Sequence, residues 1–190
     1  MRRASPQGRW PTAVIVLHAL SALLIVGLIA IGWWMRHADV EAATAFDLYQ
    51  WHKSVGFLAL AVTVTRLCAR LVFRPSPAAL GAAWERALAA IVQALLYALT
   101  LAAILAGWLL VSASPLPIPT RLFDLVVVPN LSGPNPELFA RATLAHAIIG
   151  YAIAALIALH VAGALKHQFI DRDAILRRML PRWRWNARGP

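Results

Sequence analysis

Apolar residues run through four long stretches of the chain, which polar or proline-rich segments separate. The stretches cover roughly 12–34, 53–73, 87–111 and 144–166. Each is close to the ~20 residues that an α-helix needs to cross the hydrocarbon core of a bilayer. The pattern therefore predicts an all-α integral membrane protein, in which a single domain over residues 1–190 forms a four-helix bundle.

Composition agrees with this prediction. Of the 190 residues, 61% are hydrophobic and only 14% are charged, whereas soluble domains carry about 25% charged residues. The first apolar stretch follows basic residues, as in a signal peptide, but it is too long for one and no clear cleavage site follows it. We therefore expect an uncleaved first span. Cys68 is the only cysteine, which excludes a disulfide framework and a cysteine-ligated cluster.

Basic residues gather on one side of the predicted topology. Fourteen of the eighteen lie in the N-terminal segment, around the connection between the second and third spans, or in the C-terminal tail: Arg2, Arg3, Arg9, Arg66, Arg70, Arg74, Arg86, Lys166, Arg172, Arg177, Arg178, Arg182, Arg184 and Arg188. The other side has Arg36, Lys53, Arg121 and Arg141. Because cytoplasmic loops of membrane proteins are enriched in Lys and Arg, both termini are predicted to be cytoplasmic.

This topology also accounts for the net charge of +10. The basic tail is suited to contact anionic membrane lipid. The chain carries no nucleic-acid-binding motif, so no nucleic-acid partner is expected. The connection 112–143 holds six of the twelve prolines and the apolar run LFDLVVV at 122–128, which we expect to lie along the membrane surface.

Four of the six histidines lie within the predicted spans or at their edges. Ionisable residues in a membrane are costly and usually mark function. His18 and His160 each lie about six residues, or roughly 9 Å, from the cytoplasmic edge of their spans. His52 and His146 lie near the outer edges. The spans therefore sort the histidines into an inner pair, His18 with His160, and an outer pair, His52 with His146.

The spacing within the fourth span is consistent with this sorting. Fourteen residues separate His146 from His160, and at about 100° per residue their side chains point only about 40° apart on the helix. They are separated by roughly 21 Å along its axis. One helix thus presents two ligands on one face, and the first and second spans each supply a partner.

Two pairs at different depths limit the possible ligands. The pairs are too far apart to share one structural zinc, which needs four close ligands, and the set contains no thiolate or carboxylate. Axial ligation of haem needs only two histidines that face each other between helices. Without a CxxCH motif the haem would be non-covalent. The residues predict two haem b groups with His18, His52, His146 and His160 as iron ligands.

Small residues near the ligands would let the helices open around a porphyrin, and the candidates are Gly27, Gly56, Gly150 and Gly163.

The alternative to haem binding is a non-redox helical membrane protein whose histidines are hydrogen-bonded to neighbouring helices.

Two segments carry a family resemblance. WHKSVGFLALAVTVTRLCARLVFRP at 51–75 and HAIIGYAIAALIALHVAGALKHQFIDRDAILRRMLP at 146–181 together resemble the small bacterial four-helix cytochrome b561 proteins. The resemblance implies a multi-pass di-haem b protein of the bacterial inner membrane, with one haem on His18 and His160 and the other on His52 and His146. It also implies electron exchange with ubiquinone or a similar quinone and, as in the best-known members, oxidation of superoxide. Relatives often have a histidine where this chain has Gln168, which has no role in the predicted site.

Other charged residues are weaker candidates for the site. Arg66 and Arg70, with Arg74, recur every fourth residue at the inner end of the second span. Guanidinium groups suit carboxylates, so Arg66 or Arg70 can pair with the propionates of the inner haem, or serve only as membrane anchors. Lys53 and Arg141 can contact the outer propionates or attract a small anion.

Two histidines remain outside the predicted pairs. His167 is a rival to His160 as the inner ligand, but it would lie about 10 Å nearer the cytoplasm and has no partner at its depth. His37 is expected to be solvated in the outer loop.

The sequence thus predicts an oxidoreductase, similar to superoxide oxidase, that passes electrons between a small outer-face substrate and the quinone pool. The first alternative is a haem b electron-transfer subunit that serves a separate redox partner protein. The second is the non-redox membrane protein.

Overall fold

The computed structural model describes residues 10–39, 41–73, 82–116, 118–173 and 176–179. Several basic residues that predicted the orientation lie outside the described residues: Arg2, Arg3, Arg9, Arg74, Arg182, Arg184 and Arg188.

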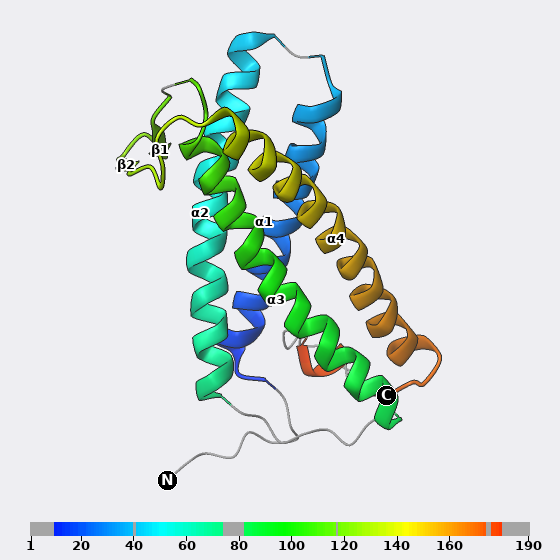
Figure 1. Cartoon of the computed structure of the whole chain (residues 1–190). Coiled ribbons are helices and arrows are strands. Elements are labelled where there is room, and N and C mark those ends of the chain that lie inside the picture. The colour runs from blue at the N-terminus through cyan, green and yellow to red at the C-terminus, as the bar shows by residue number, and fades with distance from the viewer. Residues whose placement is uncertain (1–9, 40, 74–81, 117, 174–175, 180–190) are drawn as a thin grey trace.

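Four long helices make up the described fold (Figure 1): α1 Thr12–His37, α2 Ala42–Val72, α3 Ala83–Ser112 and α4 Pro136–Phe169. All four have the length and apolar composition needed to cross a membrane. The prediction of four apolar helices is confirmed. α2 and α4 begin well before the predicted spans. Hydropathy marks only the segment of a helix that lies within the hydrocarbon core, whereas hydrogen bonding and capping decide where the helix begins.

Local chemistry explains two of these helix starts. The side chain of Asn135 accepts a hydrogen bond from the Leu138 amide (3.0 Å), and Pro136 occupies the first turn of α4, where a missing amide proton costs nothing. At the start of α3, the Glu85 carboxylate accepts a hydrogen bond from the Ala82 amide (2.8 Å). Both helices therefore begin at residues that satisfy free backbone amides.

The helices associate as two hairpins. α1 packs mainly against α2, and α3 packs mainly against α4, whereas contacts of α2 with α3 and of α1 with α4 are much sparser. Figure 1 shows α3 and α4 inclined relative to α2. Few apolar side chains are fully buried among the described residues, and many large ones are exposed, such as Leu23 at 71%. Such a surface suits lipid as the surrounding solvent.

The two ends of the bundle are distinguished here as inner and outer. The inner end is where α1 and α3 begin and α2 and α4 end. There a short 3-10 helix, η2 Leu176–Met179, contacts α4, and the Trp10 amide lies 3.4 Å from the Arg178 carbonyl oxygen. The first and last described segments therefore meet at the same end. That this end faces the cytoplasm stays a prediction.

A small β-hairpin lies at the outer end, in the connection between α3 and α4. Strand β1 Thr120–Leu122 pairs antiparallel with β2 Val126–Val128. Positive φ angles at Phe123 and Asp124 (49° and 57°) close the turn between the strands. Alternation over three residues is too short to predict a strand, which is why the sequence predicts only a surface-lying segment here.

Contacts with α2 hold this hairpin in place. The Ser54 hydroxyl donates to the Arg121 carbonyl oxygen (3.1 Å) and accepts from the Phe123 amide (3.0 Å). The Phe123 ring packs edge-on against Trp51, with ring centres 5.8 Å apart. Leu125 at the turn is 84% exposed. The loop of the second helical hairpin is thereby fixed to a helix of the first.

We expect Ser54→Ala to loosen the β-hairpin. Ser54 is only 3% exposed, so its loss leaves a carbonyl and an amide without a partner, at a cost of about 1–3 kcal/mol. Hydrogen exchange of the amides at 120–128 should accelerate. Ser21→Ala is the matched control, because Ser21 is 2% exposed and its hydroxyl bonds only to Leu17 of its own helix. Equal exchange rates in the two variants would contradict the prediction.

Candidate functional site

At the inner end, helices α1 and α4 bring two imidazoles together. The ring centres of His18 and His160 are 6.2 Å apart and their planes are inclined by 72°. Both side chains are half-buried. The structure therefore brings together the two histidines that predicted span depth assigned to the inner pair.

Towards the outer end, α2 and α4 form a second pair of the same kind. The ring centres of His52 and His146 are 6.1 Å apart, with the planes inclined by 80°, and both residues are half-buried. α4 contributes one ring to each pair, because His146 and His160 lie on nearly the same face of one continuous helix. The site thus consists of two ring pairs at two levels of the bundle.

Hydrogen bonds indicate which ring nitrogens are available. His146 Nδ1 lies 2.8 Å from the Ala103 carbonyl oxygen on α3. Since a carbonyl only accepts, Nδ1 carries the proton and Nε2 keeps its lone pair, the arrangement found in metal-binding histidines. The Nδ1 atoms of His18 and His52 are buried without a hydrogen-bond partner. Buried polar atoms left unpaired are costly, which favours a ligand in their surroundings.

Two glycines lie directly against the outer pair. A Cβ atom at Gly107 would be 3.0 Å from His146 Cε1, and one at Gly32 would be 3.4 Å from His52 Cε1. A side chain at Gly107 would therefore press on the His146 ring, and one at Gly32 would contact the His52 ring. Neither contact follows from the sequence, because which glycine faces a histidine depends on how the helices are rotated.

The glycines named from the sequence behave differently. A Cβ atom at Gly27, Gly56, Gly150 or Gly163 would meet nothing within 4 Å. These four positions are open and lie away from the histidine rings, and their place beside a porphyrin stays a prediction.

The spacing of the rings fits one metal between each pair. A metal–imidazole nitrogen bond is about 2 Å long, so two imidazoles on one metal have ring centres about 6 Å apart. The observed 6.2 and 6.1 Å match this value. The sparse contacts between the two helical hairpins are also what a flat group held between helices requires. The donor set, the free nitrogens and the spacing fit bis-imidazole haem.

Between the two levels lies an apolar cavity of 170 Å³ that is open to the surface of the bundle. It is lined by Val26 and Ile29 of α1 and by Ala154 and Ile157 of α4. The inner and outer pairs are therefore separated by aliphatic side chains on the two helices that line this cavity.

Arg66 and Arg70 lie at the inner end, on α2. Arg66 is half-buried, and its positive charge is near enough to act electrostatically on both His18 and His160. Its guanidinium carbon lies 5.2 Å from the centre of the Tyr97 ring on α3. Arg70 is more exposed. Arg66 is therefore the better placed of the two for a group held by the inner pair.

The charged residues predicted for the outer end, Lys53 and Arg141, form no hydrogen bond or ion pair with the His52 and His146 rings among the described residues. Lys53 is half-buried and follows His52 in the chain. Arg141 is exposed and pairs with Glu137, one turn earlier on α4. Of the two, Lys53 is the more closely associated with the outer pair. Contact of either residue with a propionate or an anion stays a prediction.

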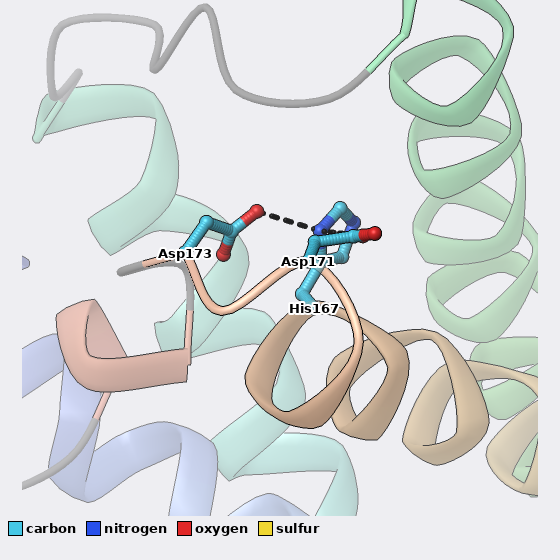
Figure 2. Close-up of side chains that lie close together, drawn as sticks. All are labelled: His167, Asp171 and Asp173. Atoms are coloured by element: carbon cyan, nitrogen blue, oxygen red, sulfur yellow. Dashed lines mark hydrogen bonds and ion pairs between the residues drawn. The ribbon is translucent and has the colours of Figure 1, made fainter.

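His167 belongs to a different cluster at the inner end (Figure 2). Its Nδ1 atom lies 2.8 Å from an Asp173 oxygen and 3.1 Å from an Asp171 oxygen. The Lys166 ammonium contacts both oxygens of Asp171 (3.0 and 2.7 Å) and also Glu85 of α3 (2.7 Å). The His167 ring is thus engaged with carboxylates, which makes it a poor rival to His160.

The same cluster has the residue types of a metal site. The ligand atoms of His167, Asp171 and Asp173 lie within 4.8 Å of one another. A cation already contacts this cluster, however, since Lys166 neutralises Asp171. We interpret the cluster as an ion-pair network that fastens the end of α4 to the start of α3.

His37 is the remaining histidine. It is the last residue of α1, it is exposed, and its ring stacks on Trp33 with centres 4.8 Å apart. It therefore contributes to neither pair.

Comparison with known proteins finds a matching family and a relative of similar length. Residues 9–182 match the family described as prokaryotic cytochrome b561. Cytochrome b561 homolog 2 of Escherichia coli (strain K12) is 30% identical over 174 residues, which cover 90% of this chain and 91% of that relative.

We expect Gly107→Val to disturb the outer pair alone. The new side chain would displace the His146 ring, from which even a Cβ atom would be only 3.0 Å away. The haem bound per chain, measured as the pyridine haemochrome, should fall by up to one equivalent. Gly133→Val is the control, because it adds the same bulk in the connection between α3 and α4, at a position with nothing within 4 Å. Equal haem content in both variants would count against the predicted contact.

Proposed function

This chain belongs to the prokaryotic cytochrome b561 family, and on that basis we propose that it is a di-haem b oxidoreductase that passes electrons between a small outer-face substrate and quinone. The family is one of haem b electron-transfer proteins of bacterial membranes, and membership therefore removes the non-redox alternative. The number of haems, their ligands, the substrates and a place in the inner membrane are parts of the proposal.

The observation that carries the proposal is the pair of ring spacings. His18 and His160 would hold one haem b, and His52 and His146 the other, because both spacings suit two imidazoles on one iron. Haem b supplies one-electron redox chemistry when bound. The protein contributes the ligands, and the Ala103 carbonyl sets the tautomer of His146.

The positions of the ligands support electron transfer across the membrane. The two histidines of α4 are separated by fourteen residues, or roughly 21 Å along the helix. Each pair therefore lies towards a different end of the bundle. A donor at one face and an acceptor near the other could then exchange electrons without meeting.

Superoxide is the proposed substrate at the outer end. It is a small anion, and the half-buried Lys53 beside His52 would attract it. Two superoxide ions, one quinone and two protons would give two molecules of oxygen and one quinol. Quinone is proposed as the acceptor because it dissolves in the membrane and takes up two electrons.

The purified, haem-loaded protein tests this activity. Superoxide and a soluble quinone analogue should yield quinol at a rate above that of the same mixture without protein. Lys53→Gln should lower the apparent affinity for superoxide and weaken its dependence on ionic strength, since screening acts on the charge. Arg36→Gln removes an exposed charge on α1 and serves as the control. A haem-loaded protein that is inactive but co-purifies with a redox protein would favour the electron-transfer subunit.

We expect His160→Ala to remove one haem and to spare the other. The substitution deletes a ligand of the inner pair, whereas the outer pair uses different residues at another level. Reduced-minus-oxidised spectra with a haem-to-protein ratio should show two haems in the parent and one in the variant. His37→Ala should keep both, because His37 lies in neither pair. Equal loss of both haems from a folded His160→Ala protein would refute the separate sites.

A further inference from the structure

At the inner end, two residues of α3 face two arginines of α2. The Tyr97 ring centre lies 5.2 Å from the Arg66 guanidinium carbon and 5.9 Å from that of Arg70. One turn earlier on α3, Gln93 accepts a hydrogen bond from Arg70 Nη1 (2.9 Å). The two helices run in opposite directions, so both contacts occur between corresponding turns. They join α2 to α3 where the two helical hairpins otherwise touch sparsely.

The position of Arg66 gives this contact a consequence for the site. Arg66 lies near the inner end of α2, at the same end of the bundle as the inner pair and close enough for its charge to influence the rings of His18 and His160. Among the described residues, no ion pair neutralises Arg66. A cation in a poorly hydrated site is costly unless a polar or π-electron partner stabilises it. The Tyr97 ring is such a partner, because its face attracts a guanidinium.

Without the Tyr97 ring, the Arg66 side chain would be expected to leave its position near the histidines. Long arginine side chains within a membrane extend towards the interface, where water solvates the guanidinium. Arg70, one turn closer to the inner end, is already exposed. Tyr97 therefore opposes the movement of Arg66 away from the histidines.

We propose that Tyr97 is a positioning residue that keeps the Arg66 charge beside the inner histidine pair and thereby raises the reduction potential of the haem bound there. This inference rests on the proposed function, because it assigns a haem to His18 and His160. Oxidation adds one positive charge to a haem, so a nearby fixed cation favours the reduced form. α3 supplies none of the four proposed ligands, yet through Tyr97 it sets a property of the inner site.

Spectroelectrochemical titration of the full-length, haem-loaded protein tests the proposal. The inner haem is identified as the one that His160→Ala lacks. Tyr97→Leu should lower the midpoint potential of the inner haem and leave that of the outer haem unchanged. Tyr97→Phe keeps the ring face and should retain the parent potential. Tyr151→Leu removes an exposed tyrosine of α4 and should change neither potential.

Arg66 provides the decisive comparison. Arg66→Gln should lower the inner potential at least as much as Tyr97→Leu, and adding Tyr97→Leu to Arg66→Gln should produce no further change. Additive shifts would overturn the proposal, because Tyr97 would then act independently of Arg66. A Tyr97→Phe protein with the low potential of Tyr97→Leu would also overturn it, since the hydroxyl group would be responsible.

The remaining outcomes are also decisive. If Tyr97→Leu does not fold, Tyr97→Met removes the ring with an unbranched side chain and replaces it in every comparison. An unchanged inner-haem potential in the variants that lack the Tyr97 ring would refute the role of Tyr97. The proposed function would still stand in that case if the unsubstituted protein binds two haems and reduces quinone. A parent that binds no haem at His18 and His160 would refute both. Failure of quinone reduction alone would affect only the proposed function, because the potentials require no quinone.

Discussion

The structure depends on one requirement: α4 must present two imidazoles on one face to partners on two different helices. His146 meets His52 of α2, and His160 meets His18 of α1, each with about the separation that a shared metal needs. A flat group held at each level, as proposed, would require the protein contacts between the two helical hairpins to stay sparse there. The hairpins accordingly pack closely within themselves and loosely against each other.

A loosely packed interior needs support elsewhere, and this chain provides it at both ends. At the outer end, Ser54 of α2 holds the β-hairpin that belongs to the connection between α3 and α4. At the inner end, Arg70 of α2 bonds to Gln93 of α3. Both contacts join the first helical hairpin to the second, one towards each end of the bundle. Cross-links at the ends can fix the separation of the hairpins without filling the space between the rings.

The sequence predicted the parts of this arrangement that follow from one-dimensional spacing. Hydropathy located four helices, and the distance of each histidine from a span edge sorted the four rings into the pairs that the structure brings together. That these pairs ligate haem iron stays a prediction. The sequence did not identify Gly107, which touches His146, or Gly32, which touches His52. Such contacts depend on the rotation of one helix against another, which spacing along a single helix does not determine.

Tyr97 was missed for the same reason, since an aromatic residue in a span is unremarkable until the facing helix is known. Its contact with Arg66 also shows how the two levels can differ chemically although their ligands are identical. A fixed cation acts mainly on the pair that it lies beside, because electrostatic interactions weaken with distance. Arg66 lies near the inner rings and Lys53 beside the outer ones, so each level has its own charged neighbour. If each pair holds a haem as proposed, these charges would set the two potentials separately.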